Sequence, residues 1–199
     1  MDFITHLVIP FLVLLALRVD AKKAVLMLPF AVIMDIDIFI PGAHRMLLHN
    51  LFVVVVIPLI VLLYLDRYKP GYREYGLIVF FYLGSHLILD LGEGMALFYP
   101  LSTDFYHIQG MLTSTHWNSI PLPSIYLDYG ITSASEITYI AEEQTAAEID
   151  TQDVSITKLP FSLVLTVLFG AGLYYKRSLT FLREMKVLIS DLKEQILKR

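Results

Sequence analysis

The sequence contains no cysteine, which excludes a disulfide framework and any thiolate metal ligand. A metal bound by this chain must therefore be held by histidine, carboxylate or backbone oxygen. The chain also lacks a signal-peptide pattern, because no basic segment precedes the apolar run 3–17 and Arg18 follows it where a small-residue cleavage site would belong. We expect this run to be retained as a membrane-spanning helix.

Charged residues are scarce as well. They make up 17% of the 199 residues, whereas hydrophobic residues make up 56% and the mean hydropathy is +0.64. Soluble domains are usually ~45–50% apolar and ~25% charged. The composition therefore favours an integral membrane protein, and the length accommodates one ordinary domain.

The apolar residues fall into segments that predict helices crossing a bilayer. A crossing needs about 20 residues, which the segment 46–65 provides outright and the others approach if flanking residues such as Arg18 and Lys176 snorkel. A soluble all-α protein with buried helices is the alternative, but the run 51–65 contains no charged residue. We predict an all-α polytopic membrane protein with about five transmembrane helices, over residues 3–17, 24–40, 46–65, 75–91 and 159–175.

The basic residues predict the orientation of these spans. If the spans alternate, all of the 15 lysines and arginines except Arg45 and Lys158 fall on one side. The positive-inside rule makes that side cytoplasmic. We therefore expect a multi-pass protein of the cell membrane with its N-terminus outside and its C-terminus in the cytoplasm.

The predicted spans divide the chain into three parts. Residues 1–106 form a membrane-embedded four-helix domain that carries the metal site, and residues 107–158 form an acidic extracytoplasmic loop or cap. Residues 159–199 form a fifth span followed by a cytoplasmic amphipathic helix. The acidic segment has turn signals at Pro121, Pro123 and 128–130 and a strand-like run at 136–141. Its composition leaves two interpretations open, a small folded cap and a loop.

The last segment carries a heptad stripe of apolar residues, Leu182, Met185, Ile189, Leu192 and Ile196. This stripe predicts an amphipathic helix on the cytoplasmic membrane surface or against the bundle. A dimerising helix, and with it a homo-oligomer, is the alternative.

Ionisable side chains at the ends of the predicted spans form the most informative pattern. Such groups cost ~2.5–3.5 kcal/mol at the centre of a membrane helix, so their presence usually has a functional reason. A lone histidine or aspartate near the membrane interface is ordinarily a packing residue or faces water. Neither role explains why many such residues would lie at the same depth. The orientation, which was derived from lysine and arginine alone, places seven of them at the same outer level: His6, Asp35, Asp37, His44, His49, His86 and Asp90. We predict that they form a metal site.

Local spacing supports this prediction. His86 and Asp90 are four residues apart and share one helix face. His44 and His49 converge if the first lies on a loop and the second in the first helical turn. Asp35 and Asp37 would point to opposite faces of a regular helix, so whether both are ligands stays open.

Seven nitrogen and oxygen donors exceed the needs of one tetrahedral zinc ion and suit two ions that activate water and clamp a phosphoryl group. The expected cofactor is one or two divalent ions, with zinc first and manganese or iron as alternatives. Arg45 suits a phosphate oxygen, and equally a lipid-headgroup anchor. We expect His107 and His116 at the surface, with a ligand role as the alternative.

Four short motifs occur in order along the first half of the chain. They are Thr5-His6, MDID at 34–37, HRMLLH at 44–49 and HLILD at 86–90, followed by GMALFYPLS at 94–102. Over residues 1–106 this order resembles the family of inner-membrane metal-dependent hydrolases described as LexA-binding and membrane-associated. The acidic segment and the final span lie outside the resemblance.

The chain departs from that family's pattern at three places. Met34 stands where proline is usual, Met46 where glycine is usual, and Leu48-His49-Asn50 where the family has Thr-His-Ser. The metal-binding residue types survive these changes. The pattern is also similar, more distantly, to zinc-dependent phospholipases C, which are helical and hold zinc with histidine and aspartate.

The resemblance implies metal-dependent hydrolysis of a phosphoester, with Asp37, His49 and Arg45 in the catalytic roles. The depth of the site favours a lipid-linked or other membrane-associated substrate at the outer face. One alternative is a non-enzymatic scaffold or regulator with a structural metal. Transport and haem binding are disfavoured because the spans lack deep ionisable residues, and nucleic-acid binding is disfavoured because the outer face is acidic.

Overall fold

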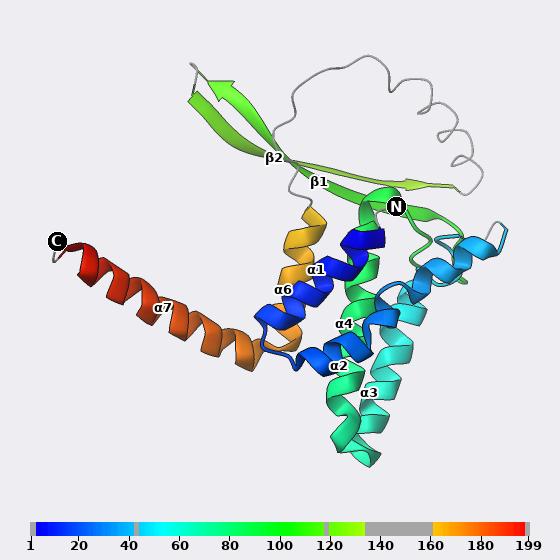
Figure 1. Ribbon diagram of the computed structural model, residues 1–199. Helices are drawn as coiled ribbons and strands as arrows, with labels where there is room; N and C mark the ends of the chain where they lie inside the picture. The colour runs from blue at the N-terminus through cyan, green and yellow to red at the C-terminus, as the bar shows by residue number, and fades with distance from the viewer. Residues whose placement is uncertain (1–2, 42–43, 118–119, 134–160, 198–199) are drawn as a thin grey trace.

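The computed structural model describes residues 3–41, 44–117, 120–133 and 161–197. The described chain is mostly helical, and its central element is α4 (Arg73–Asp90). Helix α4 contacts α1 (Phe3–Ala16), α3 (Ile57–Tyr68) and α6 (Phe161–Leu173), and Figure 1 shows these helices gathered around it.

The sequence of α4 explains its central place. Apolar residues occur all around this helix, which is typical of a helix buried on every side, and most residues from Ile78 to Asp90 are buried. Gly84 lets α6 approach closely, because a Cβ at this position would lie 2.4 Å from the ring of Phe169. Small residues at helix contacts are characteristic of packing in membranes.

The segment predicted as the second span is not one continuous helix. The structure shows α2 (Ala21–Leu26) and two 3₁₀ helices, η1 (Leu28–Ala31) and η2 (Ile33–Phe39). Pro29 lies in the first turn of η1 and has no N–H with which to continue the ladder of α2. The prediction of a continuous helix over 24–40 is therefore wrong, and the break places Asp35 and Asp37 on η2.

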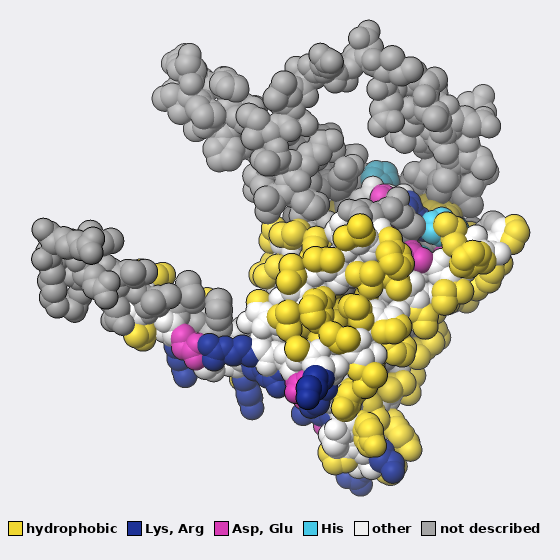
Figure 2. Space-filling model, in the orientation of Figure 1, with side chains coloured by type: hydrophobic (Ala, Val, Ile, Leu, Met, Phe, Trp, Pro, Cys, Tyr) yellow, Lys and Arg dark blue, Asp and Glu magenta, His cyan; other side chains and the backbone are white. Residues whose placement is uncertain are grey.

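Helix α3 exposes apolar side chains over most of its length. It follows η3 (Phe52–Val56), a π-helical turn, and η4 (Pro70–Tyr72) joins it to α4. Ile60 is 60% exposed and Leu63 is 71% exposed. Figure 2 shows a broad apolar surface between an end rich in lysine and arginine and an end that carries histidine. Continuous apolar surface of this kind marks a membrane or binding face.

In the part of the chain that the structure describes, one helix is long and apolar enough to cross a membrane, Pro70–Glu93. Two shorter apolar helices, Phe3–Ala16 and Ser162–Leu173, accompany it. A helix of 14 residues spans about 21 Å, less than the ~30 Å of a bilayer's hydrocarbon core. The five predicted crossings therefore stay a prediction.

A long β-hairpin follows the helices of the site. Strands β1 (Phe105–Trp117) and β2 (Ile120–Thr132) are antiparallel, with Phe105 opposite Thr132. The class prediction of an all-α chain is wrong for this segment, and the predicted turns at Pro121, Pro123 and 128–130 lie inside β2. Proline is tolerated on edge strands, which both strands of a two-stranded sheet are. The strand-like run 136–141 lies outside the described residues.

Helix α7 (Tyr175–Leu197) projects away from the other helices (Figure 1), which confirms the predicted C-terminal helix. Near its start, Arg177 donates to Glu74 and to the carbonyl of Arg18, and Lys23 donates to Glu74. The hydrogen bond that Lys23 donates to the Glu74 carboxylate raises the pKa of Lys23 above its ordinary value. Basic residues from three segments thus meet at one end of the bundle.

Candidate metal centre

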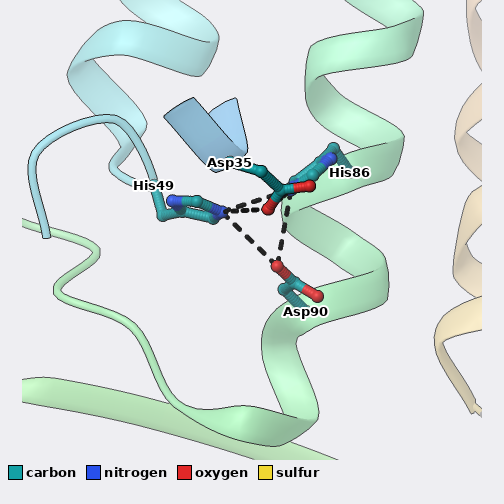
Figure 3. A group of neighbouring side chains, drawn as sticks. All are labelled: Asp35, His49, His86 and Asp90. Atoms are coloured by element: carbon teal, nitrogen blue, oxygen red, sulfur yellow. Dashed lines mark hydrogen bonds and ion pairs between the residues drawn. The ribbon is translucent and has the colours of Figure 1, made fainter. Parts of the chain in front are cut away.

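Four side chains from three segments converge at the opposite end of the bundle. Asp35 lies on η2, His49 just before η3, and His86 and Asp90 on the last turns of α4. One ligand atom from each lies within 4.8 Å of all the others, and Figure 3 shows the four side chains pointing toward a common centre. This group could hold a metal ion.

The donor atoms form a compact set of two nitrogens and two oxygens. The Nε2 atoms of His49 and His86 are 3.2 Å apart. Asp90 Oδ2 lies 3.4 Å from each of them. Asp35 Oδ1 lies 3.7 Å from His49 Nε2 and 3.4 Å from His86 Nε2.

Hydrogen bonds on the far side of each ring orient the two histidines. His86 Nδ1 donates to the carbonyl oxygen of Ala31 at 2.6 Å, and His49 Nδ1 donates to Asp37 Oδ2 at 3.0 Å. A neutral imidazole that donates from Nδ1 presents a lone pair at Nε2, the arrangement usual for metal-ligating histidine. Both lone pairs then face the centre of the cluster.

The carboxylate oxygens of the cluster also suit a cation. Among the described residues, neither Asp35 Oδ1 nor Asp90 Oδ2 receives a hydrogen bond, although both atoms are buried. Buried acceptors without donors are costly. A divalent ion between two lone pairs and two such oxygens would satisfy all four atoms.

Asp37 lies beside the cluster and organises the loop that carries His49. This fully buried carboxylate accepts hydrogen bonds from Nδ1 of both His44 and His49 at 3.0 Å. It also accepts from the backbone N–H groups of Arg45 at 3.2 Å and Leu48 at 3.4 Å. Its oxygens are therefore occupied in holding the loop and the His49 ring.

His6 brings helix α1 to the centre. Its Nε2 lies 2.9 Å from Asp90 Oδ1, and its ring is 4.4 Å from that of His86, centre to centre. Asp90 thus turns one oxygen toward His6 and the other toward the cluster.

Arg45 occupies the rim of the centre in an unusual conformation. Its φ is 60°, in the left-handed region that non-glycine residues rarely adopt and that is frequent at functional sites. The carbonyl of Arg45 accepts from the N–H of Ala96 at 2.9 Å. Its guanidinium pairs with the carboxylate of Glu93 and donates to the Glu93 carbonyl at 3.1 Å.

Asn50 supports the centre and was not predicted from the sequence. Its side-chain oxygen accepts from the N–H of Val53 at 3.0 Å, and its amide donates to the carbonyl of Leu47 at 2.8 Å. This is helix N-capping, and it anchors the residue next to His49. The resembled family has serine at this position, and serine is also a capping residue. This shared property could have identified Asn50 as a helix cap from the sequence.

The seven predicted ligands therefore divide into two groups. The structure brings Asp35, His49, His86 and Asp90 together. His6 pairs with Asp90 and Asp37 pairs with His49, whereas His44 is joined to the group only through Asp37. Of the predicted catalytic residues, His49 lies in the cluster, Asp37 behind it and Arg45 at its rim. His107 lies on β1 and is not one of the four clustered residues; the side chain of His116 lies outside what the structure describes.

Fold and centre together define a mostly helical protein with a buried His/Asp cluster that could hold a metal ion. The chain belongs to the YdjM inner membrane protein family, whose match covers residues 1–178. This confirms the resemblance and extends it, because the hairpin and α6, which were expected to lie outside it, are included. No curated protein and no solved structure matches the chain.

Proposed function

We propose that the chain is a membrane-embedded, metal-dependent hydrolase that cleaves a phosphoester of a lipid-linked substrate at the outer membrane face. The observation that carries this proposal is the pair of imidazoles whose Nε2 atoms face two carboxylate oxygens that accept no hydrogen bond from the described residues. Two nitrogens and two oxygens suit zinc, with manganese or iron as alternatives. When bound, such an ion polarises a phosphoryl oxygen and lowers the pKa of a water molecule.

The geometry favours one ion over two. Within the described ranges, no second group of three or more histidine and acidic side chains lies as close together. The oxygens of Asp37 already accept four hydrogen bonds, so this residue acts by positioning His49. We assign the ligand roles to Asp35, His49, His86 and Asp90.

The rim of the centre supplies groups for a substrate phosphate. Asp35 is the most exposed member of the cluster, with 20% of its side chain accessible, and marks the side from which a substrate approaches. His44, 33% exposed, and Arg45 lie on the loop that leads to His49. A phosphate would replace the carboxylate of Glu93 on the Arg45 guanidinium, whose planar fork binds either anion.

The placement in the membrane belongs to the same proposal. Five crossings with the C-terminus in the cytoplasm would put the basic end of the bundle inside and the cluster at the outer boundary. A lipid-linked substrate would reach that depth by lateral diffusion.

The test is elemental analysis and phosphoester hydrolysis on the detergent-purified chain. We expect stoichiometric zinc, manganese or iron in the wild type, and metal-dependent release of headgroup from phospholipid or cleavage of bis-p-nitrophenyl phosphate. Both should be lost in a His86→Ala, Asp90→Ala double variant and kept in His107→Ala, whose histidine lies outside the cluster. Absence of turnover with every one of these metals would end the hydrolase proposal.

A structural metal in a scaffold protein is the second candidate. Four protein ligands would complete a tetrahedral zinc shell, as in structural sites, whereas catalytic zinc keeps one position open. The near-complete burial of His49, His86 and Asp90 favours this candidate. Metal-dependent folding without metal-dependent turnover would select it.

A further inference from the structure

An apolar groove of about 640 Å³ runs between η1, η2, α3 and α4. Among the described residues, no charged side chain lines it, and its walls are mostly aliphatic. It lies beside the metal centre and outside the set of residues that form it.

One end of the groove adjoins the cluster through chain neighbours. Met34 and Leu48 line this end and directly precede Asp35 and His49, and Leu83 lies about one helical turn before His86. The other end is bounded by Leu65 and Tyr72, close to the basic end of the bundle.

The length of the groove is close to that of one lipid acyl chain, which covers about half of a bilayer's ~30 Å hydrocarbon core. Val53 and Leu65 both line it, and twelve residues of helix rise about 18 Å. Half of a ~30 Å hydrocarbon core is about 15 Å. An apolar chain that entered from the leaflet would therefore reach from the cluster to the groove's far end.

The volume distinguishes between two apolar occupants. A helix segment 18 Å long and 10 Å wide occupies on the order of 1400 Å³, more than twice the groove. A methylene is roughly as large as a water molecule, whose share of liquid volume is ~30 Å³, so a sixteen-carbon chain needs about 500 Å³. The groove accommodates a whole acyl chain, whereas a helix of a second copy would enter it with one face only.

We propose that this groove seats one acyl chain of a phospholipid substrate and thereby holds the headgroup phosphate at the cluster. This inference rests on the proposed function. Bilayer lipid is as apolar as the groove, so seating the chain adds little affinity. Its effect is to orient the phosphoester relative to the ligands, and orientation is a large part of catalysis.

The first test maps where an acyl chain lies. The full chain is placed in vesicles of phosphatidylethanolamine and phosphatidylglycerol that contain a trace of phosphatidylglycerol with a diazirine-labelled acyl chain. We expect photolabelling of groove residues to fall several-fold in Val61→Trp, because Val61 lines the groove and is 45% exposed, so the indole enters without displacing the core. Ile57→Trp, at another exposed groove position, is the second variant if the first is poorly folded.

The matched control is Ile60→Trp. Ile60 neighbours Val61, is also β-branched and exposed, and does not line the groove, so its variant should label like the wild type. Equal labelling of groove and outer face in all variants would overturn the inference. So would a change in oligomeric state in Val61→Trp by light scattering, since the occupant would then be a second copy.

A turnover measurement separates this inference from the proposed function. Hydrolysis of long-chain phosphatidylglycerol should fall by about tenfold to a hundredfold in Val61→Trp, while that of bis-p-nitrophenyl phosphate stays at the wild-type rate. Groove-specific labelling without hydrolysis of either substrate would support the acyl-chain site and refute the hydrolase function. If Val61→Trp hydrolysed both substrates at the wild-type rate, the hydrolase function would be supported and the acyl-chain site refuted.

Discussion

The two ends of the helical bundle place their ionisable side chains in opposite environments. At the basic end, Arg18 and Glu184 pair while their side chains are 63% and 48% exposed. At the other end, the side chains of Asp37 and His49 pair with no exposure at all. Exposed pairs contribute little to stability, whereas buried ones are costly unless their geometry is satisfied. The end with the buried pairs is costly for stability, which suggests that a function maintains it. The contrast between the two ends can be tested as follows.

Metal removal should have the largest effect. An ion that binds only the folded chain at a thousand times its Kd stabilises it by ~4 kcal/mol, which corresponds to on the order of 10 °C in Tm. We expect a chelator to lower the Tm of the metal-loaded wild type by this amount in a thermal-shift assay. The His86→Ala, Asp90→Ala variant should show no response, and a similar response there would place the metal elsewhere.

Asp37→Asn tests whether the carboxylate behind His49 acts through that ring. The amide keeps the size but weakens the acceptor of the His49 Nδ1–H, and loss of such partners typically lowers metal affinity 10–100-fold. Competition with a fluorescent chelator measures the change. Asp104→Asn is the control, because Asp104 pairs with Ser102 outside the cluster; unchanged affinity in Asp37→Asn would assign Asp37 to the loop alone.

Arg45→Lys tests the rim of the centre. Lysine keeps the charge but loses the planar fork, so we expect hydrolysis to fall by about tenfold with metal content unchanged. A parallel loss of metal would show that Arg45 serves the fold of the loop, through its left-handed backbone, and not the substrate.

Glu74→Gln should have the smallest effect. It weakens the contacts of Glu74 with Lys23 and Arg177 at the basic end, so Tm should change by no more than about 4 °C and metal content should not change. Lysine is charged at neutral pH in any case, and the raised pKa of Lys23 keeps its ion pair to higher pH, so that the pair is lost only as pH rises through that raised value. If Glu74→Gln lowered Tm as much as metal removal does, the contrast between the two ends would be wrong.

Helix α4 shows what the sequence could predict. His86 and Asp90 are four residues apart on a regular helix, and the structure places both in the cluster. The gathering of the other predicted ligands at one end of the bundle also follows from the alternation of the predicted spans, whereas their depth in the membrane stays a prediction. These are local or one-dimensional properties, and sequence patterns report them well.

The contacts between side chains of different segments could not be predicted from the sequence. A regular helix would have pointed Asp35 and Asp37 apart, and only the 3₁₀ turns of η2 and the packing of the 44–49 loop decide that one joins the cluster and the other holds His49. The carbonyl partner of His86 belongs to Ala31, whose side chain carries no signal. The hairpin was missed because its prolines are typical of turns.

The contact between His6 and Asp90 has a consequence for biogenesis. It joins α1 to the end of α4 next to the cluster, so this contact cannot form until residue 90 has left the ribosome and the intervening segments have been inserted. Under the proposed function, an ion would therefore bind only after the N-terminal half has been assembled, and metal supply would set how quickly the inserted chains mature.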